Sequence, residues 1–139
     1  MKDIAITSVK DKVFIVTGGT RGIGRGIVTE LAAQGAKVAY TYSKEDKPLQ
    51  GETLSFKADV RDYPKAEEVV AETLKRFGRL DGLVNNAGIV RDKPLMRMVP
   101  EDWQEVIETN LMGTFNYSRV VIKHLMRQKN GDILNIASI

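Results

Sequence analysis

Four glycines and one arginine fall within eight residues near the start of the chain, in the run Thr17–Gly24. They follow a short apolar run, Val13–Val16, and precede a segment with helical periodicity. Glycine lets a backbone turn tightly and approach a ligand closely, and the free amide groups at the start of a helix favour a phosphate. A strand, a glycine turn and a helix in this order therefore predict a site for the phosphates of a nucleotide.

Polar residues also follow three later apolar runs. Asp59 comes after the third run, Asn85–Gly88 after the fourth, and Ser138 after the fifth. In open parallel sheets, ligands bind beyond the carboxyl ends of the strands. We therefore expect these groups to gather at the same edge of a sheet as the glycine turn.

The elements that would position these residues alternate between strands and helices. Short apolar runs predict strands at Val13–Thr17, Lys37–Thr41, Leu54–Lys57, Leu83–Asn85 and Ile133–Ala137. Apolar positions at helical spacing predict helices at Arg21–Gln34, Pro64–Phe77 and, for most of its length, Glu101–Arg127. This alternation predicts an α/β fold, a Rossmann-type parallel sheet with helices on both faces, in a single domain over residues 1–139.

Two of these helices carry apolar residues that we expect to be buried, and one connection is short. The expected buried positions are Ile23, Ile27, Val28 and Leu31 in the first helix and Trp103, Val106, Ile107 and Leu111 in the last. The connection between the second and third strands, residues 42–53, is short for a crossover helix. We expect a loop or a single turn there.

The composition excludes several kinds of site. The 139 residues include no cysteine and one histidine, His124, so we expect no metal site built from cysteines or several histidines. The 21 basic and 18 acidic residues are scattered, which favours a solvated surface and not a nucleic-acid footprint. No apolar run approaches the ~20 residues needed to cross a membrane, and residues 1–12 lack the core of a signal peptide. We therefore expect a cytoplasmic protein without membrane or nucleic-acid partners.

The run Thr17–Gly24 resembles the TGxxxGxG pattern of the short-chain dehydrogenases/reductases. Further signatures follow in the order of that family: Asp59-Val60, Asn85–Gly88, Asn110 and Ser138. Within the family, Asn85–Asp92 and Leu95–Met98 look like the stretch that 3-oxoacyl-[acyl-carrier-protein] reductases of fatty-acid synthesis carry after their fourth strand. Related acetoacetyl-CoA reductases look similar, so another short-chain alcohol or ketone oxidoreductase is the alternative.

The resemblance implies a cofactor site for a nicotinamide dinucleotide. The residues it implicates are Gly18, Thr20, Arg21, Gly22, Ile23, Gly24, Thr41, Asp59, Val60, Asn86, Ala87 and Gly88. In this family a basic residue before the second motif glycine, here Arg21, is associated with the 2′-phosphate of NADP. An NAD site usually places an acid at the end of the second strand, but no acid occurs near Thr41 before Glu45. We therefore predict NADP(H), with a solvated arginine as the alternative for Arg21.

The resemblance also implies roles in the reaction. The family residue matching Asp59 contacts the adenine, although a surface aspartate at a strand end is the alternative. The family residue matching Asn110 distorts its helix and uses a freed backbone carbonyl to hold a water of the proton relay. The alternative for Asn110 is a polar residue packed between two halves of a helix. The residue matching Ser138 hydrogen-bonds the substrate carbonyl. Hydride transfer to a ketone also needs a proton donor.

The family donor is a Tyr-x-x-x-Lys pair roughly a dozen residues after the serine, and this chain ends at Ile139. The chain matches that spacing once, at Tyr40–Lys44. We reject this match because it lies on a predicted strand, where a four-residue spacing does not bring two side chains together.

We therefore expect the N-terminal part of a longer protein, truncated after its fifth strand. In the family strand order 3-2-1-4-5-6-7, the apolar fifth strand would lie at an open edge. The complete protein would reduce a 3-oxoacyl thioester with NADPH, on acyl carrier protein or coenzyme A, and form a homotetramer. The alternatives are a catalytically inactive cofactor-binding fragment and a non-enzymatic interaction protein. A basic patch for an acidic carrier could include Arg91, Lys93 and Arg97, and a solvated loop is the alternative there.

Overall fold

The computed structural model describes residues 8–138 and contains one parallel β-sheet. Its strands are β1 (Val13–Val16), β2 (Lys37–Tyr42), β3 (Thr53–Lys57), β4 (Gly82–Asn85) and β5 (Asp132–Asn135). They lie in the order β3-β2-β1-β4-β5, and every neighbouring pair is parallel. The predicted α/β class and the first five positions of the expected strand order are confirmed.

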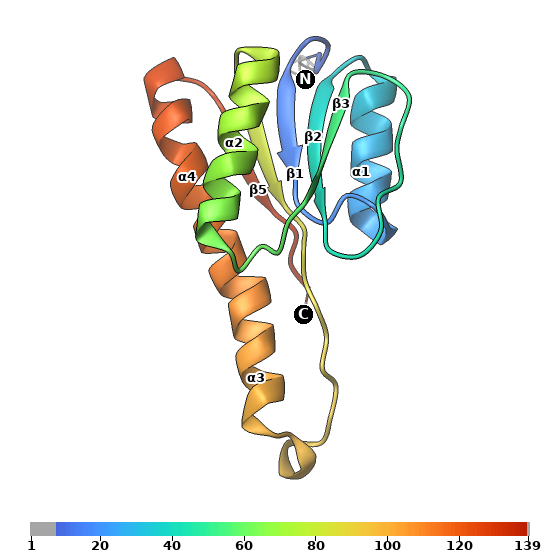
Figure 1. Cartoon of the computed structure of the whole chain (residues 1–139), viewed down its shortest axis with the longest axis vertical. Helices are drawn as coiled ribbons and strands as arrows, with labels where there is room; N and C mark the ends of the chain where they lie inside the picture. The colour runs from blue at the N-terminus through green and yellow to red at the C-terminus, as the bar shows by residue number, and fades with distance from the viewer. Residues whose placement is uncertain (1–7, 139) are drawn as a thin grey trace, which may run out of the picture.

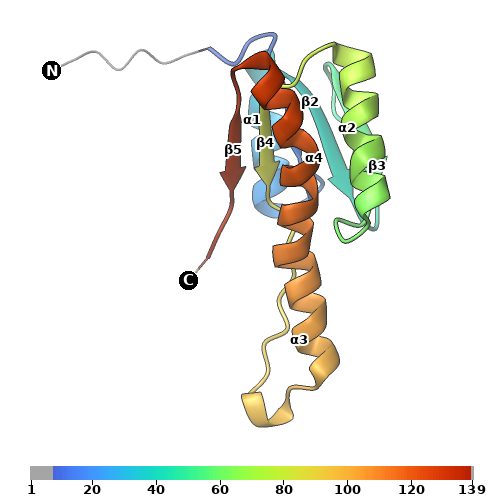
Figure 2. The ribbon, with the colours of Figure 1, turned by 90° about the vertical axis from the view of Figure 1, so that its left-hand side faces the viewer.

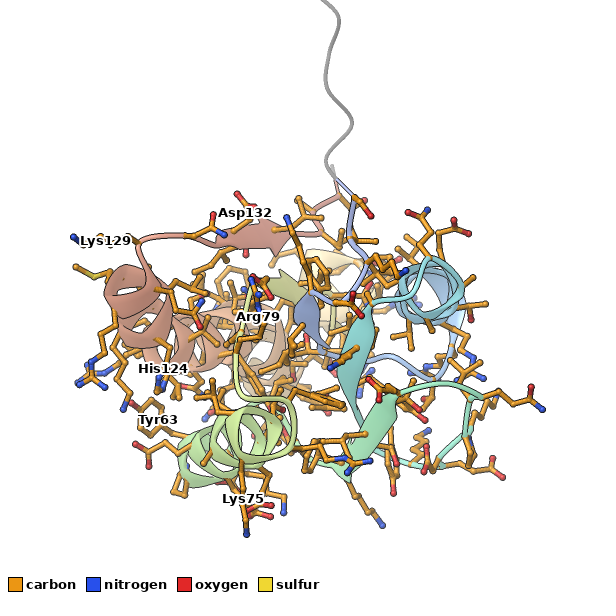
Figure 3. The ribbon with its side chains drawn as sticks, turned by 90° about the horizontal axis from the view of Figure 1, so that it is seen from above. Tyr63, Lys75, Arg79, His124, Lys129 and Asp132 are labelled. Atoms are coloured by element: carbon orange, nitrogen blue, oxygen red, sulfur yellow. The ribbon has the colours of Figure 1, made fainter. Side chains whose placement is uncertain are left out.

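Helices cover both faces of the sheet. Helix α1 (Gly22–Ala33) packs on one face, and α2 (Tyr63–Phe77) and α4 (Gly113–Gln128) pack on the other (Figure 1, Figure 3). The alternating side chains of β1 show the two layers, because Ile15 belongs to the core under α2 and α4 whereas Val16 packs with Val28 of α1. The sheet is therefore buried between two hydrophobic layers.

The ends of α2 follow the signals in its sequence. The side chain of Asp62 accepts a hydrogen bond from the Lys65 amide at 3.0 Å, which caps the start of the helix. Pro64 lies in the first turn, and Gly78 ends the helix with φ of 78°. The predicted range, Pro64–Phe77, is correct to within one residue.

The connection between β2 and β3 lies wholly within the described residues and contains no helix, as predicted. The hydroxyl of Tyr40 lies 3.0 Å from a carboxylate oxygen of Asp46 and 3.1 Å from the Lys47 carbonyl. Ser55 donates to the same carboxylate at 2.6 Å. The Tyr40 hydroxyl therefore fastens this loop to the sheet, which agrees with our exclusion of the Tyr40–Lys44 match.

The prediction of a buried stripe in the last helix is wrong for most of its residues. Trp103 and Leu111 are each 64% exposed and Ile107 is 38% exposed, whereas Val106 is half-buried. The helix has three parts: α3 (Pro100–Val106), a π-helical segment η2 (Ile107–Met112), and α4. With the short 3₁₀ segment η1 (Leu95–Arg97), α3 projects beyond the sheet (Figure 1, Figure 2). No other element of residues 8–138 covers it there.

Ile23 also departs from its prediction. Ile27, Val28 and Leu31 pack in the core as expected, but Ile23 is 66% exposed. It lies in the first turn of α1.

Strand β5 is the outermost strand on one side of the sheet, as expected, and Leu134 is 55% exposed there. Within residues 8–138, no helix is both long and apolar enough to cross a membrane.

Candidate functional site

A cleft of about 710 Å³ opens beyond the carboxyl ends of four strands. The residues that line it are Gly18, Thr20, Arg21, Gly22, Ile23, Thr41, Tyr42, Ser43, Lys44, Ala58, Asp59, Val60, Arg61, Asn86, Ala87, Gly88, Ile89, Arg91, Glu105 and Thr109. The structure thus brings together every residue predicted to bind the cofactor except Gly24, which is buried behind the turn. The binding roles of these residues stay predictions.

The glycine turn is shaped by backbone conformation and by its neighbour β2. Gly18 has φ of 68° and Gly22 has φ of 54°, a region that favours glycine. The amide of Gly18 donates to Oγ1 of Thr41 at 3.2 Å, and the amide of Gly19 donates to the Thr41 carbonyl at 2.8 Å. Thr41 is almost fully buried, so its hydroxyl oxygen braces the turn.

Two polar side chains join the turn after β1 to the turn after β4. Thr17 Oγ1 accepts hydrogen bonds from the amides of Asn86 and Ala87, each at 3.0 Å. Asn86 Nδ2 donates back to the carbonyls of Thr17 at 3.0 Å and Gly18 at 3.1 Å. Asn86 therefore supports the floor of the cleft as well as lining it. Asn85 braces the sheet, as expected, because its Nδ2 donates to Ser118 at 3.0 Å and to Asn135 at 2.9 Å.

The first turn of helix α1 presents its backbone amide groups toward the glycine turn. Arg21 is the residue before the helix, and no side chain of residues 8–138 caps the helix start. The first turn also contains no acidic residue. Uncapped amides at a helix start need partners and attract anions.

Two ion pairs neutralise part of the charge around the cleft. Arg61 pairs with Asp59 at 2.6 Å, and Arg91 pairs with Glu105 at 2.8 Å. The pKa of Asp59 is lowered chiefly by its hydrogen bonds with the Arg61 side chain. In the part of the chain that the structure describes, neither Arg21 nor Lys44 has an ion-pair partner. The cleft thus has a surplus of positive charge at the ends of β1 and β2.

Asn110 lies in the distorted part of the long helix, just outside the lining of the cleft. Its Oδ1 accepts from the Ile89 amide at 2.8 Å, and its Nδ2 donates to the Ile89 carbonyl at 3.0 Å. The Asn110 carbonyl accepts from Thr114 Oγ1 at 2.9 Å. The π-helical segment contains the distortion expected at Asn110, but this carbonyl already has one donor.

Ser138 lies beyond the carboxyl end of β5 and is exposed. It is not among the residues that line the cleft. The two predicted catalytic residues, Asn110 and Ser138, are therefore not part of the cleft wall, although Asn110 is hydrogen-bonded to Ile89, which lines the cleft. Their roles stay predictions.

Sequence reasoning missed several residues of the site. Thr17 belongs to the recognised motif, but its position alone does not show that its hydroxyl accepts two amides from the turn after β4. Arg61 and Thr109 also line the cleft. Arg61 follows Asp59 by two positions and Thr109 directly precedes Asn110, and this closeness in sequence is the signal that could have indicated them. Within residues 8–138, no three His, Asp or Glu side chains form a group that could hold a metal ion.

Known proteins resemble this chain in sequence and in structure. A family model described as short chain dehydrogenase matches residues 12–139. The chain is 39% identical over 144 residues to a 3-oxoacyl-[acyl-carrier-protein] reductase of Synechocystis sp., covering 96% of this chain and 58% of that protein. It is 39% identical over 140 residues to the 3-oxoacyl-[acyl-carrier-protein] reductase FabG of Thermotoga maritima, covering 94% of this chain and 57% of that protein.

A solved structure is also similar. A mutant of a Serratia marcescens short-chain dehydrogenase/reductase has a TM-score of 0.84 and 31% identity, covering 95% of this chain and 57% of that one. The chain thus spans a little over half the length of the curated relatives it matches. Because the family model matches nearly the whole chain, this protein belongs to the short-chain dehydrogenase family.

Proposed function

We propose that the cleft binds NADP(H) and that the complete protein carrying this chain reduces a 3-oxoacyl thioester to the 3-hydroxyacyl thioester. The observation that carries the cofactor assignment is the anion site at the glycine turn. It combines the uncapped amides of α1 with Arg21 and Lys44, which are the two cleft-lining cations that have no ion-pair partner within residues 8–138. The substrate class rests on the relatives named 3-oxoacyl-[acyl-carrier-protein] reductase, which are 39–40% identical to this chain.

The residues of the cleft fit a dinucleotide phosphate. A Cβ atom on Gly18 would lie 3.1 Å from Ala87 Cα, so glycine keeps this part of the wall open. The carboxyl end of β2 and the residues after it are Thr41, Tyr42, Ser43 and Lys44, so this stretch offers no carboxylate that would repel a 2′-phosphate. We assign that phosphate to Arg21 and Lys44, and the adenine to Asp59 and Val60.

The bound cofactor would supply hydride to the ketone carbon, and the chain would orient the substrate. Ser138 would donate a hydrogen bond to the substrate carbonyl oxygen. The Asn110 carbonyl has two lone pairs, of which Thr114 uses one, so the other can hold a water of a proton relay. The Tyr40 hydroxyl is held by the β2–β3 loop, so we assign the proton donor to the remainder of the complete protein.

A cofactor-binding module that is inactive alone is the second candidate. It is favoured because Ser138 and Asn110 stand outside the lining of the cleft.

For an acyl carrier partner, the chain offers little free positive charge beside the cleft. Arg91 and Lys93 are paired with Glu105 and Asp102, which leaves Arg97 as the one of these three cations without an ion-pair partner among residues 8–138.

Self-association is part of the proposal. Apart from Met112, the exposed large apolar side chains of the long helix recur at spacings of four and seven residues, at Trp103, Ile107, Leu111, Phe115, Ile122 and Met126. Such spacing places them along one side of a helix. Large exposed apolar surfaces mark interaction sites, which supports a homo-oligomer, expected to be a tetramer in the complete protein.

The reaction is tested by following NADPH oxidation with acetoacetyl-CoA as substrate. We expect turnover by the complete protein, and NADPH binding without turnover by the 139-residue chain. Turnover by a verified 139-residue chain would contradict our assignment of the proton donor. Failure of the chain to bind NADPH would contradict the assignment of the cleft.

Arg21→Ala tests the choice of cofactor. We expect the affinity for NADPH to fall about tenfold, because a charge-assisted contact to the 2′-phosphate is worth about 1.5–3 kcal/mol. The affinity for NADH should change less than about twofold. Fluorescence titration of the two reduced nucleotides measures both values. Arg76→Ala, at the end of α2 away from the cleft, is the matched control. An Arg21→Ala variant that keeps its preference for NADPH would refute the role of Arg21.

A further inference from the structure

The loop between β2 and β3 is anchored to the sheet through one buried tyrosine. The hydroxyl of Tyr40 lies 3.0 Å from Oδ1 of Asp46 and 3.1 Å from the Lys47 carbonyl oxygen. Ser55 of β3 donates to the other carboxylate oxygen of Asp46 at 2.6 Å. Arg25 of α1, the helix beside which this loop runs (Figure 1), donates to the Lys47 carbonyl. The Asp46 carboxylate is thus held from two neighbouring strands.

Tyr40 itself cannot follow a movement of the loop. Its side chain is 1% exposed in the core between the sheet and α1. A Cβ atom on Gly19 would lie 2.6 Å from Tyr40 Cβ, so the glycine turn packs directly on this residue. Burial first, and then the hydrogen bond with Asp46, raise the pKa of Tyr40, so its hydroxyl keeps the proton that it donates. The anchor therefore has a fixed position relative to the glycine turn.

Lys44 lies in the middle of a short span whose two ends are fixed. At one end the Tyr42 carbonyl accepts from the Ala58 amide at 2.9 Å, and at the other end Asp46 is anchored. Among residues 8–138, the three residues between these ends, 43–45, have no hydrogen-bond or ion-pair partner. Lys44 nevertheless lines the cleft. Its direction is therefore set by the ends of the span and not by partners of its own.

The anchor also decides which charge of the loop faces the cleft. Ser43 and Lys44 line the cleft, whereas Glu45 and Asp46 do not. Both oxygens of Asp46 are directed toward hydroxyl groups of the sheet. A carboxylate released from this anchor would lie two residues from Lys44 and could neutralise it. Holding Asp46 away thus keeps the positive charge of Lys44 available to an anion.

An anchor that only closes the β2–β3 connection is the simpler interpretation. Leu49 of the same loop packs against the core under α1, and Thr53 donates to the Leu49 carbonyl at 3.3 Å. These contacts hold the second half of the loop without Tyr40. An anchor that served stability alone would affect the binding of two similar nucleotides equally or not at all. The two interpretations therefore differ in whether removing the anchor changes the choice between nucleotides.

We propose that Tyr40 and Asp46 are positioning residues for cofactor selectivity: together they direct Lys44 toward the ribose phosphate that distinguishes NADPH from NADH. This inference rests on the proposed binding of NADP(H) in the cleft. Neither Tyr40 nor Asp46 lines the cleft, so both act through Lys44. Without the anchor, the span after Tyr42 has one free end, and the ammonium group of Lys44 is no longer directed.

Fluorescence titration with NADPH and NADH measures the selectivity as the ratio of the two dissociation constants. Lys44→Ala should lower the affinity for NADPH about fivefold, as for one exposed charge contact. Tyr40→Phe keeps the ring and removes the hydroxyl, so it should lower the affinity for NADPH about threefold, a part of the Lys44 effect. Its affinity for NADH should change less than about 1.5-fold. In the Lys44→Ala background, Tyr40→Phe should have no further effect on either affinity.

Three further variants separate positioning from general structure. Thr53→Val is the matched control, because it removes a hydroxyl group that holds the other end of the same loop, so it should keep the wild-type selectivity. Asp46→Ala should match Tyr40→Phe. Asp46→Asn keeps an oxygen that accepts from Tyr40 and should retain most of the selectivity. Thermal unfolding checks that each variant is folded, and Asp46→Ala serves if Tyr40→Phe is not.

The possible failures are distinct. A folded Tyr40→Phe variant with the wild-type selectivity overturns the inference and leaves the proposed function intact. Equal losses of affinity for NADPH and NADH in that variant, or a loss that persists in the Lys44→Ala background, overturn it in the same way. A wild-type chain that does not prefer NADPH overturns the inference together with the assignment of the 2′-phosphate, but not the cleft as a nucleotide site. Binding of neither nucleotide overturns the proposed function itself.

Discussion

Gly24→Ala should weaken nucleotide binding by about 10- to 100-fold. A Cβ atom at residue 24 would overlap the Gly18 carbonyl oxygen and Nδ2 of Asn86. Neither group can move freely, because Asn86 Nδ2 also donates to the Thr17 and Gly18 carbonyls and the Gly18 amide is bound to Thr41. Overpacking commonly costs about 1–3 kcal/mol and sometimes more, and about 1.4 kcal/mol is tenfold in affinity.

The same helix provides the control. Gly26 is exposed in α1, and a Cβ atom there would meet no heavy atom within 4 Å. Gly26→Ala should therefore leave NADPH binding unchanged and raise the free energy of unfolding by up to about 1 kcal/mol, the difference in helix propensity. Titration and thermal unfolding of both variants give the comparison. If Gly24→Ala binds NADPH like the wild type, the glycine turn is not the phosphate site.

Asp81 should be one of the most sensitive positions for stability. It is 4% exposed and lies just before β4, at the end of the sheet opposite the cleft. Its Oδ2 accepts from the Val13 amide at 2.9 Å, and Arg79 donates to both oxygens at 2.8 and 2.6 Å. Figure 3 views this end of the molecule, with Arg79 labelled. One carboxylate thus joins the amino ends of β1 and β4.

Asp81→Ala should lower the free energy of unfolding by about 3 kcal/mol. It leaves the buried Val13 amide without an acceptor and removes a charge-assisted pair. Urea unfolding of the variant measures the change. Glu68→Gln, which breaks the exposed pair between Lys65 and Glu68, should cost less than about 0.5 kcal/mol. Similar losses in the two variants would contradict the role given to Asp81.

The pH dependence of the free energy of unfolding gives a second test of the role of Asp81. Burial alone would raise the pKa of Asp81, but its hydrogen bonds with Arg79 and the Val13 amide more than offset this and lower it. A carboxyl with a lowered pKa in the folded state stabilises the protein above its unfolded pKa, about 3.9, and loses this contribution as the pH falls through the folded pKa. Asp81→Asn should therefore make the free energy of unfolding fall less steeply below about pH 4.

The fold was predictable where local signals agree with the core. The apolar run of β1, the proline and glycine at the ends of α2, and the short β2–β3 connection each suffice for a local prediction. The burial of the last helix was not predictable in this way, because Trp103 and Leu111 have the spacing of a core face. Periodicity shows that a helix has an apolar face, but not whether the same chain covers it.

The site was predictable to the same extent. Residues at the carboxyl ends of parallel strands gather because the sheet brings those ends together, so Arg21, Asp59 and Asn86 could be assigned to one cleft from their order alone. Pairings between side chains depend on tertiary geometry. The sequence therefore could not show that Arg61 donates to both oxygens of Asp59, or that Thr114 donates to the Asn110 carbonyl.

The hydrogen bonds of Thr17 have a consequence for the order of folding. Its hydroxyl oxygen accepts hydrogen bonds from the amides of Asn86 and Ala87, which lie 69 and 70 positions after Thr17 in the chain. Contacts between distant residues close large loops, whose entropy must be lost before the contact forms, and they are typical of slow steps. The floor of the cleft is complete only after β1 and β4 have met across α1, β2, β3 and α2. We therefore expect the proposed nucleotide site to form late in folding, after most of the helices can already form.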